Sequence, residues 1–161
     1  VDRGISAPDG IEVRPADLGC AELQSLIVEH KRRSAAASGQ CADHSLDLAR
    51  FKDADLRLWS AHRGGGPLGV GALQTLDPTH GEVKTMFTHD DARGLGVGAA
   101  ILEAILASAR DAGMTRLSLE TGAPDYFAAA RRLYERAGFS VCPPFGRYRE
   151  DPRSVFMTLT L

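Results

Sequence analysis

A glycine-rich segment that leads directly into a long apolar helix constrains this chain more than any other part of it. Residues 88–113 read THDDARGLGVGAAILEAILASARDAG, in which an arginine stands just before three closely spaced glycines. A glycine loop that opens a helix favours a bound phosphate, because free backbone N–H groups and the positive end of the helix dipole attract an anion. The helix itself is predicted by apolar residues at helical spacing, Leu102, Ile105, Leu106 and Ala109, and by a terminal Gly113.

Two common phosphate loops fit this segment poorly. A Walker loop requires a lysine and a serine or threonine at the end of the glycine run, and this segment has neither. The dinucleotide pattern G-x-G-x-x-G/A is satisfied by Gly94, Gly96 and Ala99, with Glu120 near the distance expected of a ribose-binding acid. However, the polar residues HDDAR separate these glycines from the preceding strand, and the chain has no room for the further βαβ repeats of that fold. The dinucleotide fold is therefore the less favoured alternative.

The residues before the glycine loop predict one helix and several antiparallel strands. Pro15 and Asp17 would open a helix, which the apolar spacing of Leu23, Leu26, Ile27 and His30 supports. Residues 34–40 are small and polar, and we expect a mobile connection there; residues 44–51 are too short for an assignment. Strands are expected at 11–14, 56–62, 68–76 and 82–88, with turns at 64–67 and 77–81.

The last of these strands would show simple alternation. Val83, Thr85 and Phe87 would then lie on one face, and Glu82, Lys84 and Met86 on the other.

The residues after the loop predict a strand–helix–strand unit and a final strand. We expect a strand at 116–121, a helix at 126–137 ended by Gly138, and a strand at 139–142. The final strand is predicted by alternating apolar residues that share one face, Val155, Met157, Leu159 and Leu161. The order of elements indicates a mixed α/β fold.

Length and composition are those of a globular domain. The 161 residues predict a single domain spanning 1–161, with 1–10 as a loose N-terminal arm. A net charge of −2 gives no electrostatic signature of nucleic-acid binding, and no run of residues could span a membrane. Three widely spaced cysteines predict neither a disulfide framework nor a zinc site, which favours a cytoplasmic location.

Two motifs together resemble the GCN5-related N-acetyltransferase (GNAT) family, in particular its small bacterial members. Arg93-x-x-Gly96-x-Gly98 matches the family pattern Q/R-x-x-G-x-G/A. Downstream, residues 130–139, ARRLYERAGF, resemble the family helix A-x-x-LY-x-x-x-GF. The resemblance covers most of the chain and is weakest between residues 31 and 51. It implies the GNAT fold, a central mixed but mostly antiparallel sheet that splays at the acetyl-CoA site and is flanked by helices.

The resemblance also implies acetyl-CoA as co-substrate and a set of residues that bind it. The loop would hold the pyrophosphate, with Arg93 adding a charge-assisted contact. A backbone N–H near Met86 or Phe87 would polarise the thioester carbonyl. At Phe127 many family members have an asparagine that contacts the pantetheine, so that contact is absent or supplied elsewhere. The residues expected to bind acetyl-CoA are Met86, Phe87, Thr88, Arg93, Gly94, Leu95, Gly96, Val97, Gly98, Ala99 and Tyr134.

Tyr134 and Glu82 are the expected catalytic residues. Tyr134 matches the family tyrosine that protonates the departing sulfur, although a tyrosine on an apolar stripe is also a candidate core residue. Glu82 stands eleven positions before Arg93, like the base of histone-type members, although it could equally be a solvated strand-end carboxylate. Glu120 and the histidines His44, His80 and His89 are further candidates for the base. No histidine has a metal-ligand partner at a recognisable spacing, so no metal is expected.

The resemblance implies an acyltransferase that moves an acetyl group to a primary amine of a small molecule, directly in a ternary complex. Cys142 is a weaker candidate nucleophile for an acetyl-enzyme route, because no activating base stands beside it. The acceptor groove would involve residues 40–51 and 145–154. Two alternatives stay open: a non-catalytic acetyl-CoA-binding module, and a peptide or protein N-acetyltransferase. A homodimer is a possible assembly, and neither nucleic acid nor a membrane is an expected partner.

Overall fold

A computed structural model describes residues 10–39 and 48–161 of the chain. The described residues form a seven-stranded sheet in the order β1-β2-β3-β4-β5-β7-β6, in which only β4 and β5 run parallel. The strands are β1 (Glu12–Pro15), β2 (Leu56–His62), β3 (Pro67–Asp77), β4 (His80–Thr88), β5 (Arg116–Gly122), β6 (Ser140–Val141) and β7 (Ser154–Thr160). The helices are α1 (Ala21–Ala37), α2 (Val97–Asp111) and α3 (Ala128–Arg136), with short 3-10 turns at η2 (Leu48–Lys52), η3 (Asp90–Ala92) and η4 (Asp125–Phe127).

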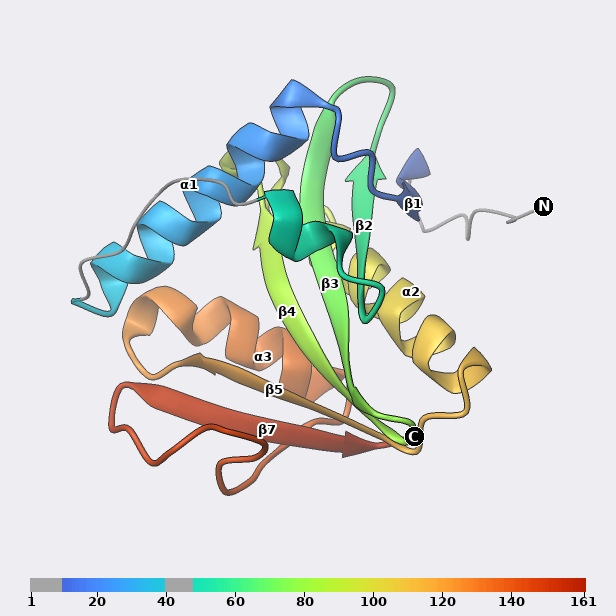
Figure 1. The fold of residues 1–161 in the computed structure, drawn as a ribbon. Helices are drawn as coiled ribbons and strands as arrows, with labels where there is room; N and C mark the ends of the chain where they lie inside the picture. The colour runs from blue at the N-terminus through green and yellow to red at the C-terminus, as the bar shows by residue number, and fades with distance from the viewer. Residues whose placement is uncertain (1–9, 40–47) are drawn as a thin grey trace.

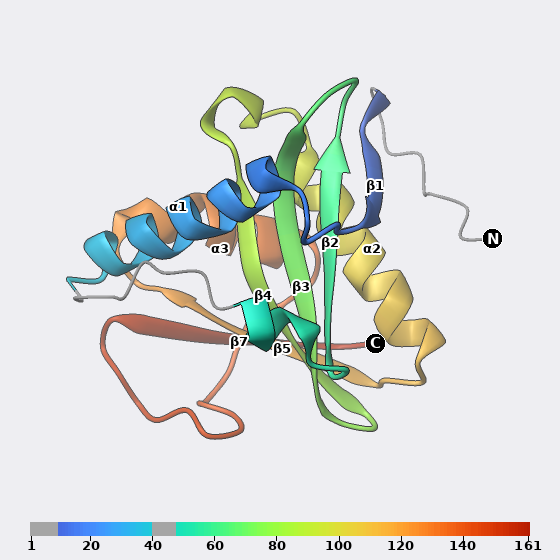
Figure 2. The same cartoon turned by 45° about the horizontal axis from the view of Figure 1, so that its top comes forward.

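The helices cover both faces of the sheet, as Figures 1 and 2 show, with α1 on one face and α2 and α3 on the other. Leu23, Leu26 and Ile27 of α1 pack against Val70 and Phe87. The larger core lies beneath α2 and α3, where the predicted stripe of α2 is buried. On the apolar face of β7 Met157 is buried, and Val155, Leu159 and Leu161 pack against this core while partly exposed. The predicted mixed α/β fold with a mostly antiparallel, splayed sheet is confirmed. A sheet with a single parallel pair contradicts the alternative, the dinucleotide fold, whose sheet is mostly parallel.

Most predicted elements are present, with corrected boundaries. The first helix begins at Ala21 and not at Pro15, because Asp17 closes a separate turn in which its carboxylate accepts from the Gly19 N–H at 2.9 Å. The expected mobile connection at 34–40 is wrong for residues 34–37, since the alanines there continue α1 and Ala35 is buried. Residues 1–9 of the expected arm and 40–47 of the expected groove lie outside the described residues.

The predicted alternation along β4 is wrong beyond Lys84. Thr85 has a φ of +56°, and the register against β3 shifts so that Thr85 and Met86 together oppose Gly71. This β-bulge adds one residue to the strand and reverses the facing of everything after it. Val83 and Met86 therefore pack on the α2 side, whereas Phe87 joins the α1 side.

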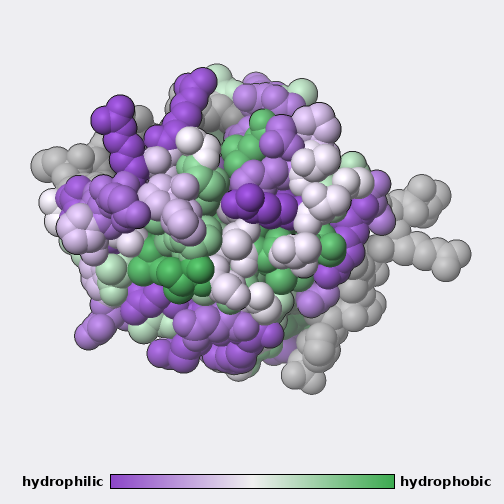
Figure 3. All heavy atoms as spheres, turned by 90° about the horizontal axis from the view of Figure 1, so that it is seen from below, coloured by the Kyte–Doolittle hydropathy of each residue, from purple (hydrophilic) through white to green (hydrophobic). Residues whose placement is uncertain are grey.

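On the side seen from below, hydrophilic residues separate several smaller apolar patches among the described residues (Figure 3). Within the described residues, no helix is long and apolar enough to cross a membrane.

Candidate active site

The sheet opens where β4 and β5 separate. The two strands pair from His80 with Arg116 to Glu82 with Ser118, and beyond Glu82 no residue of β5 pairs with β4. Figure 1 shows the strands adjacent at their starts and well apart at their ends. Because the bulge at Thr85 bends β4 just after the last pair, the sequence of this strand itself opens the sheet.

The glycine loop lies at the far end of β4 and has the geometry of an anion site. Gly94 and Gly96 have φ values of +80° and +83°, which only glycine adopts readily. A Cβ at either position would meet no atom within 4 Å, so open space lies above both. Gly96 is the N-cap of α2 and no side chain of the described residues caps this helix, which leaves its first N–H groups free. These groups fit the pyrophosphate of acetyl-CoA.

The loop residues also make contacts within the protein that the sequence did not indicate. Val97 is buried in the core, and a Cβ on Gly98 would lie 3.1 Å from Leu133, so Gly98 lets α2 approach α3. Arg93 lies over the Phe87 ring at 6.0 Å, and its Nε is 3.4 Å from Asp90 Oδ1. Contact with acetyl-CoA by Val97 and Gly98 would therefore come from their backbone.

Arg33 connects helix α1 to this loop. Its Nη1 donates to Asp90 Oδ1 at 2.7 Å, its Nε donates to Glu29 at 2.6 Å, and it lies over Phe87 at 5.8 Å. This link leaves no local signal in the sequence, because Arg33 and Asp90 stand far apart in the chain.

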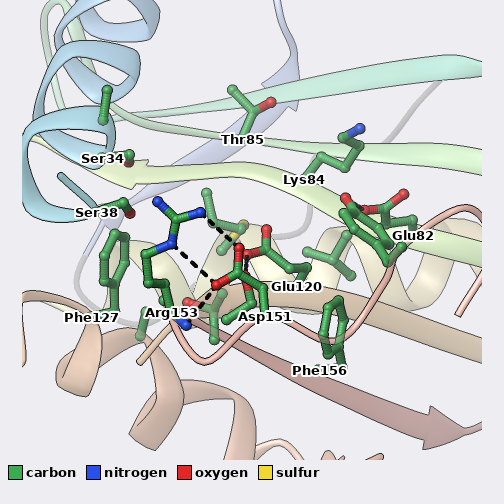
Figure 4. Close-up of a pocket in the computed structure, with 18 of the residues that line it drawn as sticks. Ser34, Ser38, Glu82, Lys84, Thr85, Glu120, Phe127, Asp151, Arg153 and Phe156 are labelled. Atoms are coloured by element: carbon green, nitrogen blue, oxygen red, sulfur yellow. Dashed lines mark hydrogen bonds and ion pairs between the residues drawn. The ribbon is translucent and has the colours of Figure 1, made fainter. Parts of the chain in front are cut away.

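A cavity of about 690 Å³ occupies the opening between β4 and β5, bounded by α1, α3 and the segment 147–156. Figure 4 shows Glu120 and the Asp151–Arg153 ion pair in the same cavity as Lys84 and Thr85 of β4. Of the predicted site residues, the cavity brings together Glu82, Met86 and Tyr134. The expected groove segment 145–154 lines it as well, with Arg147, Tyr148, Arg149, Glu150, Asp151, Arg153 and Ser154.

Tyr134 reaches the cavity from α3 and is almost completely buried, with 5% of its surface exposed. Burial raises its pKa, and the negative charge of Glu120 raises it further, so the phenol stays protonated well above neutral pH. Its ring packs edge-on against Phe139 at 5.9 Å. Within the described residues its hydroxyl has no hydrogen-bond partner, so the proton is available to a ligand.

Glu82 stands on the cavity floor at the last residue pair between β4 and β5, and only 5% of it is exposed. The hydroxyl of Tyr148 donates to its Oε1 at 2.5 Å. Glu82 is therefore not the solvated strand-end carboxylate that was the alternative interpretation. The sequence placed Tyr148 only within the expected groove segment 145–154 and gave no sign of its contact with Glu82, because that contact spans 66 positions.

Glu120, on β5, is the second carboxylate of the cavity. Its pKa is raised chiefly by burial and also by the charges of Glu82 and Asp151, while a hydrogen bond from Ser154 Oγ at 2.8 Å opposes the rise. Nearby negative charge and burial both disfavour the ionised form of a carboxyl group, which accounts for the raised pKa of Glu120.

The histidine that lines the cavity is His30, whereas the described candidate bases His80 and His89 do not line it. His30 of α1 lines the cavity beside Phe87, and burial lowers its pKa to about 4, so the imidazole is neutral. The sequence indicated only that His30 belongs to the apolar face of the helix. His80 bonds Ser118 at 2.7 Å and does not line the cavity, His89 caps η3, and His44 lies outside the described residues.

Cys142 does not line the cavity, and burial raises the pKa of its thiol. Among the residues that the structure describes, no group of His, Cys, Asp and Glu side chains could hold a metal ion.

Comparison with known proteins identifies the family to which this split sheet and its glycine-loop helix belong. Residues 16–139 match the model of the acetyltransferase (GNAT) family. The chain belongs to this family and is an acyltransferase.

Two relatives and two solved structures illustrate the similarity. The chain is 40% identical to YsnE of Bacillus subtilis, named an uncharacterised N-acetyltransferase, over 94% of this chain and all of the relative. It is 42% identical to a protein of Azospirillum brasilense named IAA acetyltransferase, over 72% of this chain and 75% of the relative. A Klebsiella pneumoniae structure, described as an acyl-CoA N-acyltransferase, superposes with a TM-score of 0.80 at 28% identity, covering 94% of this chain and 97% of the other. A GNAT acetyltransferase from Elizabethkingia anophelis with acetyl-CoA bound shares the fold, with a TM-score of 0.69 at 19% identity and coverage of 95% and 99%.

Proposed function

We propose that this protein transfers an acetyl group from acetyl-CoA directly to the primary amine of a small molecule. The observation that carries the proposal is that Tyr134 of α3 and Glu82 of β4 line one cavity at the split in the sheet. Acetyl-CoA supplies the activated acyl group, and an uncapped helix end stands where its pyrophosphate would bind.

The chain's own groups perform the proton transfers. An ammonium ion with a pKa near 10 is not nucleophilic at neutral pH, so the acceptor must lose a proton, and Glu82 is the base that we assign. The departing sulfur gains a proton, for which Tyr134 is suited because its hydroxyl has no hydrogen-bond partner in the described part of the chain. Direct transfer is favoured because Cys142 lies outside the cavity lining.

The acceptor class follows from the charges of the cavity. Among the described residues Lys84, Arg147 and Arg149 form no ion pair, although all three line the cavity. Cations without carboxylate partners favour an anionic group on the ligand, and the carboxylates Glu82 and Glu120 favour its amine. An amino-acid-like molecule satisfies both, whereas a basic peptide would place further positive charge against these cations.

Matched amine pairs test the proposal. Amino acids and the corresponding decarboxylated amines are offered with acetyl-CoA, together with a polyamine, a lysine peptide and IAA, and free thiol is measured. We expect turnover, and a kcat/KM at least tenfold higher for the amino acid of each pair. Preference for the decarboxylated amine would contradict the acceptor class, and thiol release with the peptide alone would indicate a peptide acetyltransferase. Binding of acetyl-CoA without transfer to any acceptor would refute the enzymatic role.

A further inference from the structure

The Tyr148 hydroxyl contacts the Glu82 carboxylate in the wall of the cavity. Tyr148 Oη lies 2.5 Å from Glu82 Oε1. The carboxylate is buried on the floor of the cavity, whereas the tyrosine is half-buried and belongs to the segment that walls its acceptor side. The phenol is thus the more exposed partner of the pair, and an amine approaching from that side would reach it first.

The Tyr148 ring is held in place by other aromatic residues. Its centroid lies 5.1 Å from that of Phe145 and 5.4 Å from that of Phe156, and Phe145 in turn packs against His80 at 5.8 Å. Such edge-on and tilted contacts fix the direction of the ring. The hydroxyl is therefore presented to Glu82 without the entropy cost of ordering a free side chain.

We propose that Tyr148 is a catalytic residue that relays the proton of the acceptor amine to Glu82. A phenol oxygen can accept one hydrogen bond while it donates another. The ammonium N–H bond breaks as its proton moves to Tyr148 Oη, and the Tyr148 proton moves at the same time to Glu82 Oε1. The nitrogen lone pair thus freed attacks the thioester carbonyl carbon and forms the new C–N bond. As the adduct collapses, the C–S bond breaks, the sulfur leaves with its bonding pair and takes the proton of Tyr134, and the nitrogen releases its second proton to solvent. Tyr134 regains a proton from solvent, and Glu82 gives up its proton once the product has left.

Two features of the surroundings suit this relay. Burial and the hydrogen bond to Glu82 both raise the pKa of Tyr148, so the phenol keeps the proton that it must pass on. The second carboxylate, Glu120, is already engaged by Ser154. His80 does not line the cavity but packs against Phe145 behind the Tyr148 ring. The other titratable and charged groups that line the cavity are His30 and Lys31 of α1, Lys84 of β4, Glu120 of β5, Tyr134 of α3, and Arg147, Arg149, Glu150, Asp151 and Arg153 of the segment before β7.

The inference rests on the proposed function, and its test is a mutant cycle of Tyr148→Phe, Glu82→Gln and the double variant. Each single variant is expected to lower kcat/KM near neutral pH about 10²-fold, the usual contribution of a positioned proton acceptor. The kcat/KM of the double variant is expected to be no lower than that of the more impaired single variant, because both groups belong to one proton-transfer path. The losses should shrink towards pH 10, where the amine is neutral without help.

Three controls separate a relay from a structural role. Tyr148→Phe keeps the ring, so the melting temperature and the affinity for acetyl-CoA should match the wild type. Tyr126→Phe, at a 40%-exposed tyrosine outside the cavity lining, should leave activity unchanged. In mixtures of light and heavy water the wild-type rate should depend on deuterium content along a curve, since two protons move, and the Tyr148→Phe rate along a straight line.

The outcomes distinguish the relay from the function beneath it. If Tyr148→Phe turns over like the wild type while Glu82→Gln is impaired, Glu82 takes the proton without the tyrosine and the relay is wrong. Additive losses of about 10⁴-fold in the double variant would also refute it. Full activity of both single variants would move the base to Glu120 or solvent. A wild-type protein that transfers acetyl to no amine would overturn the proposed function, and the relay with it.

Discussion

Replacing Tyr134 with phenylalanine separates chemistry from folding at the centre of the cavity. The hydroxyl has no partner among the described residues, so its removal breaks no hydrogen bond, and the ring keeps its contact with Phe139. We expect the free energy of unfolding to change by less than about 1 kcal/mol. Turnover should behave differently, because a general acid contributes roughly 10²- to 10⁴-fold.

The expected loss for Tyr134→Phe lies at the lower end of that range. Burial raises the pKa of this phenol, which makes it a weaker donor to a leaving thiolate with a pKa near 8.5. A 10²-fold fall in kcat corresponds to about 2.7 kcal/mol of transition-state stabilisation. Single-turnover thiol release measures this fall, while calorimetric titration with coenzyme A should give an unchanged affinity. Wild-type turnover in a folded variant would remove the general-acid role, and a melted variant would show that the hydroxyl satisfies a buried partner.

Three further predictions concern the ligand, the loop and pH. Coenzyme A at 100 times its Kd should stabilise the protein by about 2.7 kcal/mol in a thermal melt, whereas NAD should have no effect; the reverse result would support a dinucleotide site. Gly96→Ala and Gly64→Ala each place alanine at a positive φ, and each should lower the free energy of unfolding by roughly 1 kcal/mol in denaturant titrations. Only Gly96→Ala should weaken coenzyme A binding, by about tenfold, and equal affinities of the two variants would contradict the loop assignment. Folding lowers the His30 pKa from 6.5 to about 4, so the folded state favours the neutral imidazole. The free energy of unfolding should therefore be unaffected by this group above pH 6.5 and should fall by up to about 3 kcal/mol as the pH drops to 4. His30→Gln should remove this part of the pH dependence of the unfolding free energy.

The sequence was sufficient for the features that depend on local patterns. The stripe of α2, the apolar face of β7 and the glycines that precede α2 are read directly from residue spacing. The early start assigned to the first helix was wrong because the Asp17 turn and a helix opening share the same residue preferences.

The features that escaped prediction depend on contacts between distant segments. No local signal reveals that Tyr148 meets Glu82, or that Arg33 meets Asp90. The neutral state of His30 could not be predicted either, since its burial arises from the way α1 packs over Phe87, which is distant in the chain. The alternation of β4 failed for a different reason, because a single added residue leaves no mark on the composition of a strand.

That added residue also governs which substitutions β4 can accept. On the α2 side the strand presents Val83 and then Met86, whose sulfur would lie 2.6 Å from a Cβ on Gly71. A library that varies every second position from Val83 would therefore mix two environments after Thr85, one beneath each helix. Deletion of Thr85 would turn Phe87 from α1 towards α2, so an alignment gap at this point exchanges the two faces of the strand. Position 85 thus decides which later residues of β4 align with which residues of a related strand.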